Sequence, residues 1–200
     1  MKLRQLEIQL QNVHGFRSPR LEAEQYMTPA PLAARMLYHA AMNGDISNLH
    51  VCDLGCGTGM LSIAAALLGA DVIAIDFDPV ALAIARENAE FFGVDITFSE
   101  ACIDDIDFDL TADTVVMNPP FGAQMVHADR PFITAALRIA PVCYGIFNEG
   151  SLPFLTTYIR DHGQILEKIS AWLTIPRLFS FHTRNSLNIP VNIVHLERFT

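Results

Sequence analysis

The chain has 200 residues, of which 13 are basic and 22 are acidic, so its formal net charge is −9, and 51% of its residues are hydrophobic. This composition excludes an intrinsically disordered chain and a polybasic tail protein, and the length predicts a single domain, 1–200, with a buried core. The longest apolar stretch, 60–75, is interrupted by Ser62, Gly69 and Asp71. No segment is therefore long and apolar enough to predict a membrane span.

The N-terminus carries charged residues among isolated leucines and lacks the apolar segment of a signal peptide. The cysteines have no C-x-x-C spacing, so neither a zinc site nor a disulfide framework is predicted. We expect a cytoplasmic protein without a bound metal, in which the reduced thiols pack as small hydrophobic groups. The cysteines are Cys52, Cys56, Cys102 and Cys143.

The predicted elements begin with a polar amphipathic segment and a helix over about 31–42, and we expect residues 1–48 to form a helical lid on a core comprising residues 49–200. From residue 49 onward, short apolar runs alternate with helical stretches. Strands are predicted over 50–54, 70–76, 94–100, 113–118 and 142–148, and helices over 60–68, 79–92 and 131–139.

The last 40 residues contain two predicted strands, 164–175 and 189–199, with a loop and no helix between them. Parallel strands need helical crossovers, whereas antiparallel strands do not. The whole pattern therefore predicts an α/β fold with a Rossmann-like, doubly wound, mostly parallel sheet and an antiparallel pair at one edge.

A glycine-rich segment, DLGCGTG over 53–59, follows the first predicted strand and precedes a helix. Its third glycine comes one residue earlier than in the G-x-G-x-x-G loop that seats a pyrophosphate, which disfavours nicotinamide and flavin cofactors. Glycines allow close backbone approach, which suits the amino-acid end and sulfonium of S-adenosylmethionine. An ordinary structural glycine turn is the alternative. The candidate cofactor-binding residues of this loop are Asp53, Gly55, Gly57, Thr58 and Gly59.

Asp76 ends the second predicted strand, 23 residues after Asp53. A carboxylate at this place can accept hydrogen bonds from both hydroxyls of a ribose, and it would repel a 2′-phosphate. We therefore predict that Asp76 binds the ribose of S-adenosylmethionine.

The segment Asn118-Pro119-Pro120-Phe121 follows an apolar strand, at the end where ligands bind in open parallel sheets. The two prolines stop the strand and form a stiff extended turn. We expect the Asn118 side-chain oxygen and the Pro119 carbonyl to accept hydrogen bonds from an exocyclic amino group, with Phe121 stacked on the flat ring. These acceptors favour the developing ammonium of the transition state, and water can take the proton afterwards. A proline-rich turn with a core phenylalanine is the alternative.

Together, DLGCGTG, the strand ending at Asp76 and NPPFG are similar to class I S-adenosylmethionine-dependent methyltransferases that modify amino nitrogens. More narrowly, residues 21–199 resemble the methyltransferase-like 5 family, which methylates an adenine N6 in small-subunit ribosomal RNA. The motifs that carry this resemblance are LEAEQYMTP (21–29), NPPFGAQ (118–124), HADRPF (127–132) and IPRLFSFH (175–182).

The resemblance implies an RNA-binding enzyme in which Gln25, Tyr26 and Thr28 of an N-terminal lid touch the cofactor, and it implies a small zinc-containing activator protein of the Trm112 type. The family usually has an acid near the cofactor adenine, at the position of Cys102 in this chain. Either Asp104 takes that role, with Asp105 beside it, or contacts from Ile103 suffice.

An acidic protein that binds RNA needs a local positive patch, because phosphates dominate the affinity. The candidates are Lys168, Arg177, His182, Arg184 and Arg198, which could also be ordinary surface residues. Two other functions remain open. A protein-glutamine N5 methyltransferase usually has N-P-P-Y, so Phe121 weighs against it, and a non-catalytic, cofactor-binding ribosome-assembly subunit would fit the cysteine at position 102 and the net charge.

Overall fold

A computed structural model of the chain describes residues 1–20, 24–107, 109–122, 127–176 and 186–199. Parts of the segments that carry the family resemblance, including residues 21–23 and 123–124, lie outside the described residues. So do three members of the predicted basic patch, Arg177, His182 and Arg184.

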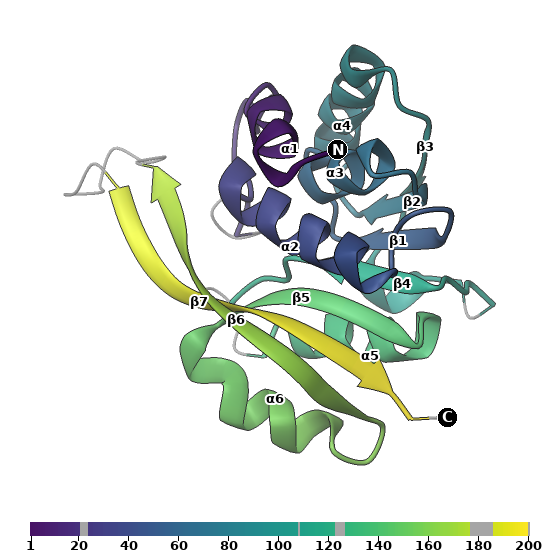
Figure 1. Cartoon of the computed structure of the whole chain (residues 1–200), viewed down its shortest axis with the longest axis vertical. Helices are drawn as coiled ribbons and strands as arrows, with labels where there is room; N and C mark the ends of the chain where they lie inside the picture. Colours follow the sequence, from purple (N-terminus) through teal and green to yellow (C-terminus); the bar gives the residue numbers. More distant parts are fainter. Residues whose placement is uncertain (21–23, 108, 123–126, 177–185, 200) are drawn as a thin grey trace.

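Within the described residues, 7 strands form one mixed sheet in the order β3-β2-β1-β4-β5-β7-β6 (Figure 1). Strands β1 to β5 are parallel to one another, whereas β7 lies between β5 and β6 and is antiparallel to both. This arrangement confirms the predicted Rossmann-like, mostly parallel sheet with an antiparallel pair at one edge. The strands are β1 His50–Leu54, β2 Asp71–Asp76, β3 Ile96–Glu100, β4 Thr114–Met117, β5 Val142–Asn148, β6 Gly163–Pro176 and β7 Ser186–Arg198.

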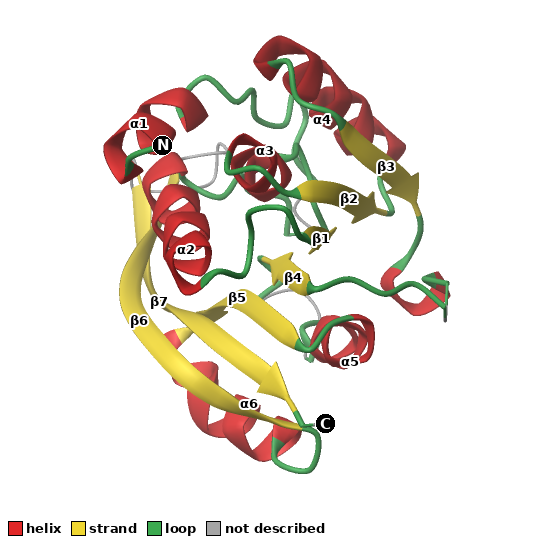
Figure 2. Ribbon diagram, turned by 45° about the vertical axis from the view of Figure 1, so that its right-hand side comes forward, coloured by secondary structure: helices red, strands yellow, loops and turns green. Residues whose placement is uncertain are grey.

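Helices cover both faces of this sheet, with α1 to α4 on one face and α5 and α6 on the other (Figure 2). In the part of the chain that the structure describes, no helix is long and apolar enough to cross a bilayer. The helices are α1 Leu3–Leu10, α2 Ala30–Asn43, α3 Met60–Leu67, α4 Pro79–Phe92, α5 Arg130–Ile139 and α6 Leu152–Ile159.

Two of these helices, α1 and α6, are absent from the elements predicted above. Helix α1 has 8 residues and buries only Leu6 and Leu10, so its periodic signal is short. Helix α6 also has 8 residues and consists largely of β-branched and aromatic side chains, which favour helices weakly. Packing against the rest of the protein, rather than local preference, stabilises both.

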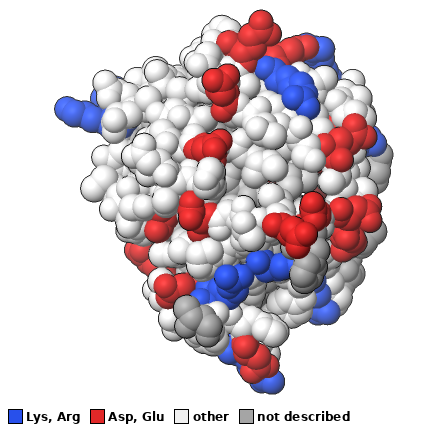
Figure 3. All heavy atoms as spheres, turned by 90° about the vertical axis from the view of Figure 1, so that its right-hand side faces the viewer, with Lys and Arg blue, Asp and Glu red and all other residues white. Residues whose placement is uncertain are grey.

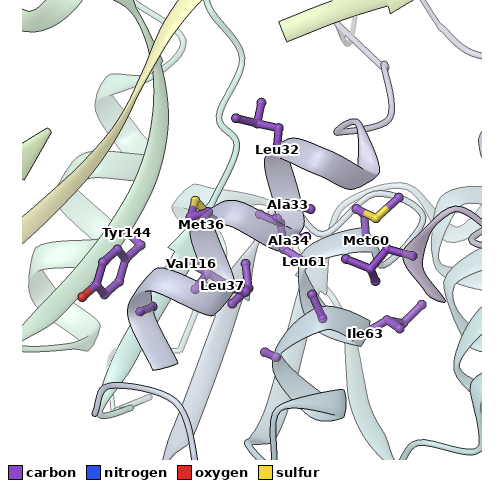
Figure 4. Packing of buried hydrophobic residues seen from close by; sticks show 14 of the residues in the cluster. Leu32, Ala33, Ala34, Met36, Leu37, Met60, Leu61, Ile63, Val116 and Tyr144 are labelled. Atoms are coloured by element: carbon purple, nitrogen blue, oxygen red, sulfur yellow. The ribbon is translucent and has the colours of Figure 1, made fainter. Parts of the chain in front are cut away.

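The core lies in two layers because successive side chains of a strand point to opposite faces of the sheet. On one face, side chains from α2 and α3 meet Val116 of β4 and Tyr144 of β5 (Figure 4). On the other face, Met117 and Cys143 pack against α5 and its neighbours. Burial on both faces explains why the central strands are continuous apolar runs in the sequence.

Candidate active site

A pocket of about 410 Å³ opens where β1, β2 and β4 end. Its wall combines the glycine-rich segment, the end of β2, the turn that follows β3, the residue after β4, the N-terminal segment and the start of α5. The sequence-predicted residues that line it are Gln25, Tyr26, Thr28, Asp53, Gly55, Gly57, Thr58, Asp76, Cys102, Ile103, Asp104, Asn118 and Pro120.

Three predicted site residues are not among those that line the pocket. Gly59 is the N-cap of α3 with a φ of 88°, Pro119 is buried, and Phe121 packs against Tyr26 with 5.9 Å between the ring centroids. Phe121 thus lies beside Tyr26 and is not among the residues that line the pocket, and its stacking on the flat ring of a substrate stays a prediction. Asp105 also lies outside the pocket wall, whereas its neighbour Asp104 belongs to it.

The glycine-rich segment is held close to two phenylalanines from distant parts of the chain. Gly55 and Gly57 have φ angles of 72° and 54°, which favour glycine. A Cβ atom at Gly55 would lie 2.9 Å from the ring of Phe132, and one at Gly57 would lie 3.0 Å from the ring of Phe16. Any larger residue would therefore be strained and would also narrow the pocket.

Asp76 is oriented by two backbone groups. Its carboxylate accepts hydrogen bonds from the Gly57 N–H at 2.8 Å and from the Asp78 N–H at 2.9 Å. Burial raises the pKa of Asp76, and these two hydrogen bonds oppose the shift. Each carboxylate oxygen keeps acceptor capacity toward the pocket, which is the arrangement needed to bind a pair of hydroxyls.

Asp53, the first residue of the glycine-rich segment, is fully buried. The Ser62 hydroxyl donates to Oδ2, while Oδ1 has no hydrogen-bond partner among the described residues. Burial raises the pKa of Asp53 to about 7, although Ser62 opposes the shift, and Asp76 adds to it. A buried oxygen without a partner costs about 1–3 kcal/mol. A cationic ligand in the pocket would remove this cost.

Asn118, which lines the pocket, also has a buried side-chain oxygen without a described partner. Its side-chain Nδ2 donates to the hydroxyl oxygen of Thr28 at 2.9 Å, and its Oδ1 is buried without a partner among the described residues. The carbonyl end of the amide is therefore available as an acceptor at the end of β4.

The segment 24–28 contacts the turn that follows β4 and holds it in position. The Phe121 N–H donates to Glu24 Oε2 at 2.8 Å, and the Tyr26 ring packs on Phe121. Burial, together with the nearby Glu24, raises the pKa of Tyr26. With the bond between Thr28 and Asn118, these contacts fix the turn from the N-terminal side.

Gln25 connects the same segment to α4. Its Nε2 donates to Asp78 Oδ2 at 2.6 Å, its Oε1 accepts from the Arg20 N–H at 2.9 Å, and the Arg20 guanidinium lies 2.8 Å from Asp78. Asp78 also caps α4 by accepting from the Val80 N–H. Burial opposes ionisation of Asp78, but the bonds from Gln25, Val80 and Arg20 outweigh it and lower the pKa of Asp78.

Asn88 of α4 provides a second connection to the N-terminal segment. It is fully buried, its Oδ1 accepts from the His14 N–H, and its Nδ2 donates to the carbonyls of His14 and Thr58, each at 2.9 Å. The described parts of the N-terminal segment, around His14 and Arg20 and over 24–28, are thus connected to α4, to the glycine-rich segment and to the turn after β4.

Sequence reasoning missed several residues of the pocket wall. Phe16 carries no local signal, and Phe132 and His127 stand in a segment that we noted only for its family resemblance. Phe77 could have been found, because it directly follows Asp76 at the end of β2. The other missed residues are Glu24, Met27, Cys56, Met60, Leu61, Ile75, Ala101, Ile106, Ala128 and Pro131.

Comparisons with known proteins agree with this architecture. Residues 35–119 match the family model of ribosomal protein L11 methyltransferase (PrmA). The chain is 35% identical over 100% of its length to the rRNA N(6)-adenosine-methyltransferase METTL5 of Danio rerio, and it covers 99% of that protein. It is 36% identical over 99% of its length to an uncharacterized protein of Methanocaldococcus jannaschii, of which it covers 95%. A crystal structure from Pyrococcus horikoshii superposes with a TM-score of 0.93 at 33% identity, covering 100% of this chain and 99% of that one.

Proposed function

Because the chain belongs to the METTL5 family of rRNA N6-adenosine-methyltransferases, we propose that it transfers a methyl group from S-adenosylmethionine to the N6 amino group of an adenosine in ribosomal RNA. The observation that carries this proposal is the buried, unpartnered Oδ1 of Asn118 beside a glycine-walled pocket. An acceptor at this place matches the needs of an exocyclic amino group.

The acceptor groups and the backbone of the pocket fit S-adenosylmethionine. Asp53 Oδ1 is an acceptor for the ammonium group, Asp76 for the ribose hydroxyls, and the backbone at Gly55 and Gly57 allows close approach. When bound, this cofactor supplies an electrophilic methyl group on its sulfonium. The remaining residues that we propose for the cofactor site are Gln25, Tyr26, Thr28, Thr58, Gly59, Cys102, Ile103, Asp104 and Asn118.

The chain's own part in the reaction is to bind and orient the amino nitrogen. The lone pair of an aromatic amine is delocalised into its ring, so the nitrogen is a weak nucleophile. Asn118 Oδ1 and the Pro119 carbonyl accept hydrogen bonds from its two N–H groups and stabilise the positive charge that develops during attack. The stiff diproline turn keeps these acceptors in place, and Phe121 supports the turn by packing on Tyr26. The product ammonium is acidic and loses its proton to water.

Methyl transfer from labelled S-adenosylmethionine to ribosomal RNA tests the proposal. We expect Asn118→Ala to lower turnover by about 100-fold or more, as the loss of one transition-state acceptor does elsewhere. Calorimetry should give a cofactor affinity within about threefold of the wild type, since Asn118 mainly serves the substrate. Asn188→Ala is the control, because Asn188 is exposed on β7 and bonds only Thr174 among the described residues.

Each other outcome points to a different function. Equal incorporation into RNA by wild type and Asn118→Ala overturns the assignment of Asn118. Incorporation into a translation release factor instead of RNA identifies a protein-glutamine N5 methyltransferase. Failure to bind S-adenosylmethionine, with or without an activator, identifies a non-catalytic subunit.

We also propose that a small zinc-containing activator of the Trm112 type binds this protein in the cytoplasm. Strand β3 is an open edge that pairs only with β2 in the described sheet, and Val80 and Phe91 on the neighbouring α4 are 63% and 64% exposed. Such an edge with apolar neighbours is a suitable docking site. Co-expression that raises the melting temperature of the wild type, but not that of Phe91→Asp, would support this partner.

A further inference from the structure

Arg130 begins α5 next to the pocket, and its guanidinium packs on two aromatic rings of α6. The guanidinium carbon lies 4.8 Å from the ring centroid of Phe154 and 5.9 Å from that of Tyr158. The His127 ring stacks on Phe154 as well, at 6.3 Å between the centroids. His127 and Pro131 line the pocket, so Arg130 lies next to the pocket wall without belonging to it.

The charge of Arg130 is not compensated by any described residue. Its Nε is buried without a hydrogen-bond partner, and the side chain forms no ion pair with a described carboxylate. A guanidinium with free donors is costly to bury unless a ligand completes its hydrogen bonds. Packing on Phe154 and Tyr158 restricts the guanidinium, so less entropy is lost when it binds a ligand.

The other cations near the N-terminal wall of the pocket are neutralised. Arg20 pairs with Asp78, and Arg17 pairs with Glu87. Arg130 is therefore a free positive charge at the rim of an acidic protein, among the residues that the structure describes.

The surface at the amino ends of the parallel strands, opposite the pocket, lacks among its described residues the broad positive patch that RNA binding needs (Figure 3). Glu197 near the end of β7 pairs with Val142 at the start of β5. The C-terminus marked in Figure 1 therefore lies on the side of the molecule where the parallel strands begin. Figure 3 shows this side, where acidic side chains are spread widely and basic ones form only small groups. Two of its arginines, Arg138 and Arg198, bind backbone carbonyls. Arg198, a member of the predicted basic patch, thus lies away from the pocket.

We propose that Arg130 binds a backbone phosphate of the RNA strand beside the target adenosine, an inference that rests on the proposed function. The amino group of an adenine is reached only when the base leaves its stack, so the neighbouring phosphates come to lie at the pocket rim. A guanidinium stacked on one face still offers its N–H edge, which matches two phosphate oxygens. The aromatic pair Phe154 and Tyr158 serves as the platform that holds it there.

Binding of a single-stranded RNA oligonucleotide with one adenosine, followed by fluorescence anisotropy with S-adenosylhomocysteine present, tests this site without methyl transfer. We expect Arg130→Gln to raise Kd about tenfold and to reduce the slope of log Kd against log salt by about 0.7. Arg130→Lys should keep the salt slope and bind more weakly than wild type. Arg160→Gln is the matched control, since Arg160 is exposed at the end of α6 and pairs with Asp161.

A second series replaces one phosphate at a time by an uncharged methylphosphonate. Wild type should lose affinity at the position bound by Arg130, and Arg130→Gln should lose nothing more there. If Arg130 only joins α5 to α6, Arg130→Gln will lower the melting temperature and leave the salt slope unchanged, which overturns the inference.

The outcomes separate this inference from the proposed function. An Arg130-dependent salt slope in a protein that methylates no adenosine supports the phosphate site and rejects the function. Adenosine methylation with an unchanged slope in Arg130→Gln supports the function and rejects the phosphate site. A wild-type protein that binds no RNA rejects both.

Discussion

The side-chain amide of Asn118 donates to the hydroxyl of Thr28 at 2.9 Å, although the two residues are 90 positions apart. This bond leaves Asn118 Oδ1 free to accept. The acceptor at the end of β4 is therefore oriented by the N-terminal segment, not by the sheet alone. Thr28 is a positioning residue for Asn118, and four predictions follow from this and related contacts.

Thr28→Val removes the hydroxyl that accepts from Asn118 while keeping a similar shape. We expect kcat to fall about tenfold, because the amide loses one orienting hydrogen bond of about 1.5 kcal/mol. The KM for RNA should change less. Thr28→Ser should restore most of the activity, since it returns the hydroxyl. Equal loss in both variants would mean that Thr28 acts through packing instead of the hydrogen bond.

Asp53→Asn should change how stability depends on pH. The pKa of Asp53 is about 7 in the folded protein against an ordinary 3.8, because burial disfavours the charge. The folded state therefore binds the Asp53 proton more tightly than the unfolded state does. The resulting stabilisation of the folded protein is complete below about pH 4 and is lost as the pH rises toward 7. Wild type should lose stability relative to Asp53→Asn by at most about 1.4 kcal/mol per pH unit in this window.

Urea denaturation of both proteins without cofactor, at pH 5 and pH 7, measures the difference. The pKa of Asp76 is also raised, so Asp76 contributes to the pH dependence of stability in both proteins. Only the difference between wild type and Asp53→Asn therefore isolates the contribution of Asp53. A stability difference that is equal at the two pH values contradicts the assignment. Asp53→Asn should also bind S-adenosylmethionine more weakly, because the ammonium loses its anionic acceptor.

Gly57→Ala should impair both stability and cofactor binding. Its φ of 54° and the ring of Phe16 at 3.0 Å oppose a side chain. Gly93→Ala is the matched control, since Gly93 has a φ of 62° but no atom within 4 Å of an added Cβ. Each substitution should cost about 1–2 kcal/mol of stability. Only Gly57→Ala should weaken cofactor binding in calorimetry, and similar cofactor affinities in the two variants would argue against a close approach at Gly57.

Asn88→Ala should release the N-terminal segment. Three hydrogen bonds to His14 and Thr58 are lost, and each buried group left without a partner costs about 1–3 kcal/mol. We expect faster proteolysis within residues 11–20 and a lower melting temperature. Asn12→Ala, which removes an exposed side chain that bonds only α1 carbonyls among the described residues, should change stability by less than about 0.5 kcal/mol. Cleavage at the same rate in both variants would contradict this role.

Elements with strong local signals could be predicted from the sequence. The bounds of β1, α4 and β5 agree with the predicted ranges, since their apolar runs end at clear turn or cap residues such as Asp78. Helices α1 and α6 were missed because tertiary packing, not propensity, determines them. The hairpin of β6 and β7 was recognised as two strands, but its register depends on pairing that no single segment encodes.

In the candidate site, too, residues with local sequence signals could be predicted, whereas contacts between distant segments could not. Asp76 and Asn118 were found because each directly follows or ends a parallel strand, where ligands gather. The contacts of Phe16 and Phe132 with the glycines were not found, because they join segments far apart in the chain. The bond from Phe121 N–H to Glu24 is likewise invisible to local patterns.

The position of β7 inside the sheet has a consequence for biosynthesis. Strand β6 is made before β7, yet it reaches β5 only through β7. While the ribosome adds residues at about 5–20 per second, β6 must remain unpaired until the final strand emerges. A chain that stalls before residue 186 would expose the edges of both β5 and β6 to other nascent chains, and such unpaired edges favour aggregation.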